Sequence, residues 1–366
     1  LYFRVVAPLS ILVGLLSVVL GTAHAASAQP SALRQVVATG HRVPGGGTFD
    51  RFSVESLPIL APVNDRGQVA FFATVARGPT AEGVFLAAAG RVLKIAREGD
   101  RVPGSGTITG FGRHPIPALN ADGSVAFAAA MTGGKTVEGI FLAKQGRLQP
   151  VAVAGQSAPD SPSGTFAALD APALNDRGDV AFLATIRRGR ETVEAVWLRA
   201  GGRLKKIVAQ GDPAPAGGVF AGFGPPALNN HGLVAFGAVI EGRAVPGGIF
   251  LFDGKQVRML AGAGEEAPVG GILAKFSERV ALNDAGAVAF TAVLKNAPAA
   301  AGIFVAVDGR LNNVAALGDT APGGGTFSYF GLWPALSASG AVVFTASVDG
   351  GPSPVGVFLA EGAVST

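Results

Sequence analysis

One short pattern, Asn-x-x-Gly, returns along this chain at an almost constant interval. It begins at Asn64, Asn120, Asn175, Asn229 and Asn283, at spacings of 56, 55, 54 and 54 residues, and Ser337 takes the sixth place 54 residues later. Two residues after each glycine comes Val-Ala-Phe, or Val-Val-Phe in the last copy. A period this regular indicates a repeat architecture, in which every copy is one structural unit.

Each copy contains four segments with the composition of short β-strands, here called a to d in chain order. In the third copy, strand a leads from Thr165 towards Asn175, and strand b is the Val-Ala-Phe segment that starts at Val180. Strand c reads Gly-Ile-Phe-Leu, as at residues 139–142, and strand d reads Arg-Leu-x-x-Val-Ala, as at residues 147–152. Four short strands in a repeat of about 55 residues are typical of one blade of a β-propeller.

Strand b is apolar on both sides, which indicates burial on both faces. In the third copy Val180 and Phe182 point one way, while Ala181 and Leu183 point the other. Such burial is expected when blades pack face to face, because each sheet then lies between two neighbours. Strand d instead carries charges and, at Pro150, a residue without an N–H group. We therefore expect strand d to be the exposed edge of each blade.

The two ends of the repeat array complement each other. The first copy is preceded by a lone strand of type d, Leu33–Ala38, and the sixth copy ends after its strand c, Val357–Leu359. Pairing of these segments would complete six four-stranded antiparallel blades and close the ring. We therefore predict an all-β fold, a six-bladed β-propeller closed by its N-terminal strand. The alternatives are an open array or a ring that is paired differently.

The N-terminus has the features of a secretory signal peptide. Arg4 precedes an apolar run from Val5 to Leu20, and the small-x-small pattern Ala23-His24-Ala25 follows. An uncleaved anchor is the alternative, but the run is shorter than the roughly 20 residues that span a membrane. We expect cleavage after Ala25 or Ala28, a secreted or periplasmic location, and no stable membrane span afterwards. The predicted division is 1–25 signal peptide, 26–32 linker and 33–366 propeller.

Composition narrows the chemistry that the chain performs. The net charge is +4 without a concentrated Lys/Arg stripe, so we expect no nucleic-acid partner. There is no cysteine, which excludes disulfides, thiol catalysis and Cys-ligated zinc. His41, His114 and His231 lie in different copies, and the spacing reveals no Ser-His-Asp set. We expect a monomer with no catalytic residues, no metal and no cofactor.

The Asn-Asp-x-Gly turns, as at Asn175 and Asp176, allow two interpretations. Carboxylate and amide oxygens suit calcium, but each turn supplies only one or two acidic side chains. Turn chemistry explains the same residues, because Asn bonds its own backbone two residues on and Gly178 supplies a positive φ. We favour the turn interpretation and keep calcium as the alternative.

At residues 175–182, Asn-Asp-Arg-Gly-Asp-Val-Ala-Phe, and at the five counterparts, the chain resembles a group of bacterial tandem-repeat proteins. These proteins are described as containing NxxGxxAF repeats with a choice of surface anchors. The resemblance covers about residues 33–359 and implies an exported or surface-held protein without an established activity. It therefore transfers no catalytic residue. Two departures are Ser337 in the sixth motif and the lack of an apolar tail before Thr366.

The loops between strands b and c differ most between the copies, and in a meandering blade they lie opposite the motif turns. They carry the basic residues Arg77, Lys135, Arg187, Arg188, Arg190, Arg243 and Lys295. Loops on a rigid scaffold are common recognition sites. The resulting hypothesis is a non-catalytic module that binds a cell-envelope glycan or a protein ligand; otherwise these residues form a solvated charged rim. The alternative function is a secreted propeller hydrolase or lyase acting on polysaccharide.

Overall fold

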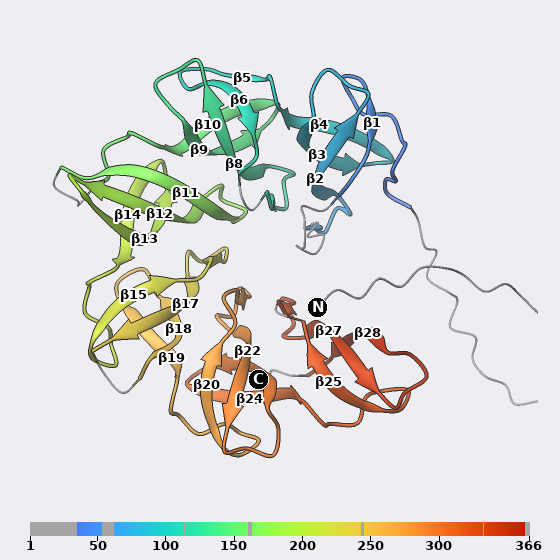
Figure 1. Ribbon diagram of the computed structural model, residues 1–366, viewed down its shortest axis with the longest axis vertical. Helices are drawn as coiled ribbons and strands as arrows, with labels where there is room; N and C mark the ends of the chain where they lie inside the picture. Colours follow the sequence, from blue (N-terminus) through green and yellow to red (C-terminus); the bar gives the residue numbers. More distant parts are fainter. Residues whose placement is uncertain are drawn as a thin grey trace, which may run out of the picture. The chain divides into compact units, whose positions relative to one another are not determined.

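The computed structural model describes residues 35–52, 62–112, 115–159, 163–242, 245–331 and 333–362. Within these ranges the regular structure consists of β-strands alone, without a helix. Residues from Val36 onward form one compact unit, in which six antiparallel sheets are arranged as a six-bladed β-propeller (Figure 1). This confirms the all-β fold and the number of blades. The predicted signal peptide and linker lie outside the described residues.

The first three blades contain strands β1 to β14. Blade one consists of β1 (Thr48–Phe49), β2 (Val69–Ala76), β3 (Glu82–Ala88) and β4 (Arg91–Arg97). Blade two consists of β5 (Arg101–Val102), β6 (Gly106–Gly110), β7 (Ala118–Leu119), β8 (Val125–Thr132), β9 (Glu138–Lys144) and β10 (Arg147–Val153). Blade three consists of β11 (Thr165–Leu174), β12 (Val180–Arg188), β13 (Glu191–Ala200) and β14 (Arg203–Ala209).

The last three blades contain strands β15 to β28. Blade four consists of β15 (Val219–Phe223), β16 (Ala227–Leu228), β17 (Val234–Glu241), β18 (Gly247–Phe252) and β19 (Val257–Gly262). Blade five consists of β20 (Ile272–Phe276), β21 (Ala281–Leu282), β22 (Val288–Lys295), β23 (Ala301–Val307) and β24 (Arg310–Ala316). Blade six consists of β25 (Thr326–Phe330), β26 (Ala335–Leu336), β27 (Val342–Asp349) and β28 (Val355–Ala360).

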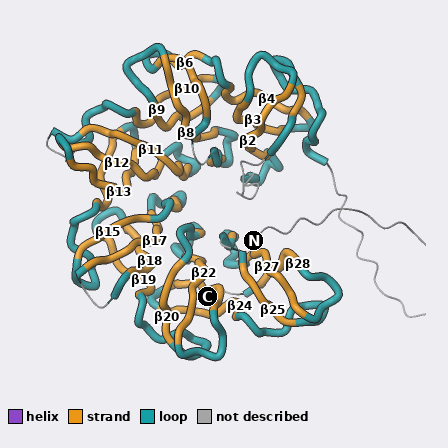
Figure 2. The backbone as a smooth tube through the Cα atoms, viewed as in Figure 1, coloured by secondary structure: helices purple, strands orange, loops and turns teal. Residues whose placement is uncertain are grey.

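Strand a of the repeat is interrupted in most blades. In blade four its two pieces, β15 and β16, both pair with β17, and a register shift follows Phe220. Blade three keeps one continuous β11 with register shifts after Phe166 and after Asp170. Strands b, c and d then follow as neighbours, which gives each sheet the meandering order that the repeat predicts (Figure 2). The interruption bends strand a and places a short irregular segment between its two pieces.

The cores lie between adjacent blades, as the apolar pattern of strand b predicts. Phe182 and Ala181 are both 0% exposed. Phe182 packs in a cluster shared with blade two, whereas Ala181 packs in a cluster shared with blade four. Burial of one such phenylalanine stabilises the fold by about 1.5–3 kcal/mol. The face-to-face packing therefore explains why strand b carries no polar side.

Strand d forms an outer edge in blades one to five, as predicted. The sheet orders end on β4, β10, β14, β19 and β24. Lys94 of β4 is exposed, and Pro150 lies in β10 where the pairing with β9 shifts register before Ala152. Charge and proline at these positions disfavour pairing with another chain.

The predicted closing strand does not form in the described part of its segment. Residues 35–38 belong to no strand, and β28 pairs with β27 alone among the described strands. Val37 packs against the core of blade one, so its side chain is used there instead. Val357 of β28 is 72% exposed, which leaves this face of blade six uncovered by the described residues. Leu33 and Arg34 lie outside those residues.

Candidate functional site

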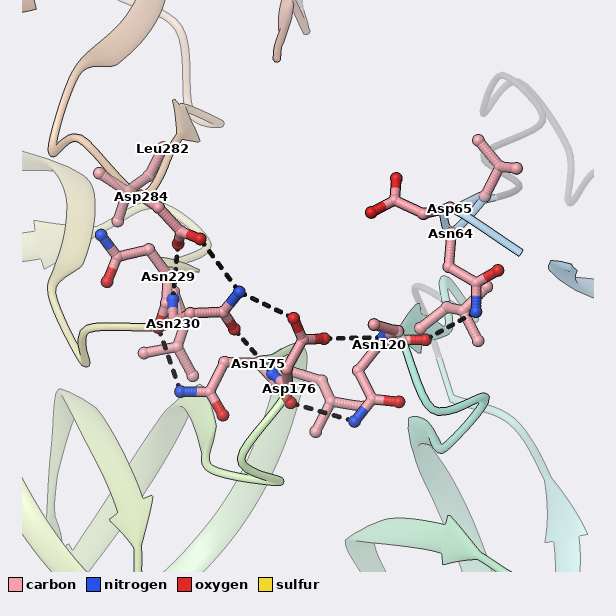
Figure 3. A pocket seen from close by; sticks show the side chains of 14 residues that line it. Asn64, Asp65, Asn120, Asn175, Asp176, Asn229, Asn230, Leu282 and Asp284 are labelled. Atoms are coloured by element: carbon pink, nitrogen blue, oxygen red, sulfur yellow. Dashed lines mark hydrogen bonds between the residues drawn. The ribbon is translucent and has the colours of Figure 1, made fainter. Parts of the chain in front are cut away.

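The Asn-x-x-Gly turns of the blades meet around one small central pocket (Figure 3). Its volume is about 220 Å³, and residues of blades one to five line it. Each blade supplies the residues at the start of its motif, because that motif directly follows the inner piece of strand a. The centre of the propeller is thus built from the repeat signature itself.

Each motif asparagine shapes its own turn and ties its blade to the next one. Asn175 Oδ1 accepts hydrogen bonds from the backbone N–H groups of Arg177 at 3.1 Å and Asp179 at 2.9 Å. Asn175 Nδ2 donates to the backbone oxygen of Asn229 at 3.1 Å. The same inter-blade bond, at 2.9 to 3.2 Å, joins Asn64 to Asn120, Asn120 to Asn175, Asn229 to Asn283 and Asn283 to Ser337.

Ser337 reproduces only the first of these two functions. Its Oγ accepts a hydrogen bond from the N–H of Ala341 at 2.9 Å and shares a second one with Ser339 Oγ, also at 2.9 Å. A hydroxyl on this short side chain has no amide to donate into a neighbouring turn. The substitution therefore marks blade six as the one copy whose motif lacks the inter-blade donor.

The residues that follow the asparagines of blades two to five form a second set of bonds at the centre. Asp176 Oδ1 accepts from the backbone N–H of Ala121 at 2.7 Å. Asn230 Nδ2 donates to Asp176 Oδ2 at 2.8 Å and to Asp284 Oδ2 at 3.1 Å (Figure 3). These oxygens are occupied by bonds within the protein, and no cluster of three or more His, Asp or Glu in the described ranges is placed to hold a metal. The contacts support the turn interpretation of the motif.

A larger pocket of about 830 Å³ opens beside blade four and is called the inter-blade pocket here. Blade four contributes Phe223 to Pro225, Gly237 to Val239, and Pro246 to Gly247. Blade three closes one side and blade five the other. Its apolar lining includes Phe223, Phe276 and Val239, and Val239 is 54% exposed. Apolar pockets with a few polar groups are the usual form of ligand sites.

The inter-blade pocket carries charges of both signs, two lysines and three carboxylates. Blade five supplies Lys275 and Lys295, whose exposed side chains make no ion pair or hydrogen bond to any described residue. It also supplies Glu278, whose carboxylate acts on the nearby Arg279. Blade three supplies Asp170 and Glu194, and Glu194 Oε2 already accepts from the N–H of Phe223 at 2.9 Å. The two lysines are therefore the cations most available to an acidic ligand.

Arg279 lies next to the inter-blade pocket, in the irregular segment of strand a in blade five. Its guanidinium stacks over the ring of Trp333 in blade six, at 5.2 Å from the centroid. Burial lowers the pKa of Arg279, while the carboxylates of Asp170 and Glu278 act in the opposite direction. The stacking and the two carboxylates hold this cation in place, which leaves the lysines, and not Arg279, as groups that a ligand can reach.

The structure does not gather the seven basic residues predicted to bind a ligand. Arg187, Arg188 and Arg190 share the β12–β13 hairpin and are exposed. Arg77 and Lys135 are exposed on blades one and two, while Arg243 lies outside the described residues. Only Lys295 lines the inter-blade pocket. Lys275 was not among the predicted residues, because strand a was expected to serve only the fold. A comparison of strand a between the copies shows lysine at this position where two other copies have glycine.

The six antiparallel sheets are joined at the centre by hydrogen bonds from asparagine side chains. This arrangement defines the chain as a β-propeller repeat protein. A family model matches residues 22–297 and 246–363. The chain belongs to that family, which is a family of unknown function (DUF7453). A comparison with curated proteins finds no match.

Solved propeller structures are similar at low identity. A puromycin hydrolase aligns over 87% of this chain, with 12% identity and a TM-score of 0.48, but this chain covers only 46% of that protein. An oligogalacturonate lyase in complex with manganese aligns over 88% of this chain and 81% of its own length, also with 12% identity and a TM-score of 0.48. An ulvan lyase of a polysaccharide lyase family aligns over 86% and 84%, with 10% identity and a TM-score of 0.42. No activity is carried over from these proteins.

Proposed function

We propose that this protein is a non-catalytic binding module and that its inter-blade pocket takes an acidic ligand. The observation that carries the proposal is the pair Lys275 and Lys295, which line an apolar pocket without a partner among the described residues. An ammonium group beside apolar surface is attractive to an anion, because partial exclusion of water strengthens the interaction. This moves the predicted site from the b–c loops in general to the junction of blades four and five.

The proposal includes a secreted or periplasmic location. It rests on Arg4, the apolar run that follows and the Ala23-His24-Ala25 pattern. The resemblance to NxxGxxAF repeat proteins points the same way. The described residues contain no helix of the length and apolarity needed to cross a membrane.

A binding role accounts for the described side chains better than hydrolysis or elimination does. General acid–base catalysis needs a titratable group within about 3 Å of the reacting atom. Neither His nor Tyr lines the central pocket or the inter-blade pocket, so the titratable groups there are carboxylates and lysines. In the inter-blade pocket Glu194 accepts from the N–H of Phe223, and the Glu278 charge acts on Arg279. At the centre, the Asp176 and Asp284 carboxylates are engaged by Asn230. A hydrolase or lyase remains the rival hypothesis.

A paired glycan and acidic-peptide array tests the proposal. Wild-type protein is expected to retain acidic probes, and the double variant Lys275→Glu/Lys295→Glu is expected to lose them because two attractive charges become repulsive. The triple variant Arg187→Glu/Arg188→Glu/Arg190→Glu is the matched control on the β12–β13 hairpin. Loss of binding only in the triple variant would move the site to that hairpin. Turnover of a retained glycan, followed by chromatography, would favour the rival hypothesis.

A further inference from the structure

A glutamate three residues before the central aromatic residue of strand c joins each of the first three blades to the next one. Glu82 Oε1 accepts from the backbone N–H of Phe111 at 3.0 Å. Glu138 Oε1 accepts from the N–H of Leu169 at 2.7 Å, and Glu194 Oε2 from that of Phe223 at 2.9 Å. In every case the acceptor reaches an equivalent position of strand a in the following blade, which in blade three lies within the continuous β11. The repeat therefore contains its own carboxylate-binding position at these three junctions.

The junction of blades four and five lacks this carboxylate. The residue at the start of strand c in blade four is Gly247, and the strand a residue that corresponds to Phe111 and Phe223 is Phe276. Gly247 and Phe276 both line the inter-blade pocket. Gly247 has no side chain, so this position supplies no carboxylate to the N–H of Phe276.

Strand a of blade five, on the other side of the same junction, also differs from the earlier copies. A Cβ atom built on Gly110 would lie 3.1 Å from Glu82 Oε1, and one built on Gly222 would lie 3.9 Å from Glu194 Oε2. The corresponding residue in blade five is Lys275, one place before Phe276. Compared with the earlier junctions, this junction lacks the strand c glutamate on the blade four side and has an additional lysine on the blade five side. Both changes suit a carboxylate that comes from outside the chain.

We propose that the inter-blade pocket binds a glutamate side chain of a partner protein, presented on an extended peptide, at the position that Gly247 leaves vacant. This rests on the proposed function. The incoming carboxylate is expected to take the place of the repeat's own glutamate, with the N–H of Phe276 as donor and Lys275 and Lys295 as counter-charges. Apolar side chains that flank the glutamate pack against Phe223 and Val239.

The lining favours a peptide over an acidic sugar. Phe223, Pro225, Val239, Pro246 and Phe276 present mostly hydrocarbon surface. Such surface matches leucine or phenylalanine side chains better than the hydroxyl-rich ring of a uronate, whose desolvated hydroxyls would lack partners. A glutamate side chain is also the group that this repeat accommodates at its other junctions.

Titration of ¹⁵N-labelled full chain with the peptide acetyl-Leu-Glu-Phe-amide tests the inference. The expected result is a saturable shift of the Phe276 amide resonance, together with heat release in calorimetry. Acetyl-Leu-Gln-Phe-amide is the matched probe and is expected to bind about tenfold or more weakly, because it lacks the charge. Equal binding of both peptides would overturn the inference.

Two variants locate the carboxylate. Lys275→Ala/Lys295→Ala is expected to weaken binding of the Glu peptide by about tenfold or more. Gly247→Glu is expected to abolish it, because the chain then supplies its own carboxylate. The added Cβ would lie 2.7 Å from Ala238 O, so a small backbone shift is needed. Ala301→Glu introduces glutamate at the same place in blade five and is the control that keeps binding.

A third probe separates this inference from the proposed function. Trigalacturonate carries carboxylates on sugar rings and has no apolar side chain. If it binds in a manner that depends on Lys275 and Lys295 while the Glu peptide does not bind, the peptide inference fails and the proposed function stands. If neither probe moves the Phe276 amide resonance, both fail.

Discussion

Asn175 in blade three donates a hydrogen bond of 3.1 Å to the backbone oxygen of Asn229 in blade four. Its side chain is buried, at 3% exposure, and its Oδ1 simultaneously accepts two N–H groups of its own turn. An amide side chain offers an acceptor and donors on two separate atoms, so it can serve its own turn and the next blade at once. The motif therefore needs asparagine, because aspartate has no donor and serine is too short to reach the next blade.

Replacement of this asparagine should destabilise the propeller. For Asn175→Ala we expect a loss of about 1–3 kcal/mol in the free energy of unfolding, because two buried N–H groups and one carbonyl lose their partner. Ser337→Ala is the matched control and should cost less, since that turn has no inter-blade donor. Urea unfolding followed by tryptophan fluorescence measures both. Equal losses would show that the inter-blade bond contributes nothing beyond the turn.

Asp179 should make the fold sensitive to acid. Burial is the largest influence and raises its pKa, but hydrogen bonds from Asn175, Arg177 and Gly201, together with the charge of Arg177, outweigh it and hold the pKa below the usual 3.8. Because the folded-state pKa lies below the unfolded-state pKa, the Asp179 carboxylate stabilises the fold at pH values above the unfolded-state pKa. This stabilisation is lost as the pH falls through the folded-state pKa. Asp179→Asn should therefore flatten the loss of stability on the acid side, measured by urea unfolding between about pH 2 and 6.

Glu82 should show the opposite dependence. Burial raises its pKa above the usual 4.5, and the charge of Glu98 adds to this, against the hydrogen bond from Phe111. The folded state then holds the proton more tightly, so stability falls as the pH rises from about 4.5 through the folded pKa. Glu82→Gln keeps an acceptor for Phe111 and should be relatively more stable at pH 7 than at pH 4. A variant that loses stability equally at both values would contradict this.

Calcium should leave the melting temperature unchanged. Asp176 and Asp284 already accept hydrogen bonds from Ala121 and Asn230, so a cation would have to displace these bonds. Differential scanning calorimetry with about 5 mM calcium and with chelator measures this, since a ligand that binds only the folded state raises the melting temperature. A rise of several degrees with calcium would revive the metal interpretation of the motif.

Ring closure by the N-terminal segment stays a prediction. The crossover that follows it is built like the others, because Gly40 N donates to Phe49 O at 2.8 Å as Gly99 N does to Ile108 O. If residues 33–38 complete blade six, their deletion should lower the melting temperature of the whole propeller as one transition. The internal control is replacement of residues 26–32 by a Gly/Ser linker. A truncated chain that melts like its parent would count against closure.

Local patterns in the sequence were sufficient for the all-β fold and the number of blades, but not for the closing strand, which does not form in residues 35–38. The Asn-x-x-Gly period set the number of blades, and the two-sided apolar character around Phe182 predicted packing between sheets. Both depend on interactions that every copy repeats, so periodicity reveals them. Lys94 and Pro150 likewise marked strand d as an edge, because an unpaired strand must disfavour new partners through its own residues.

The tertiary structure decided which of the basic residues share a pocket. Arg187 and Lys295 occupy equivalent places in their copies, yet only Lys295 faces the inter-blade pocket. The reason is that Gly247 lies in blade four and Lys275 in blade five. Only the tertiary structure shows that both residues line the same pocket. The repeat by itself determined how each blade is built. The contact between two blades with different residues determined where the inter-blade pocket lies, because the substitutions that form one junction are far apart in the sequence.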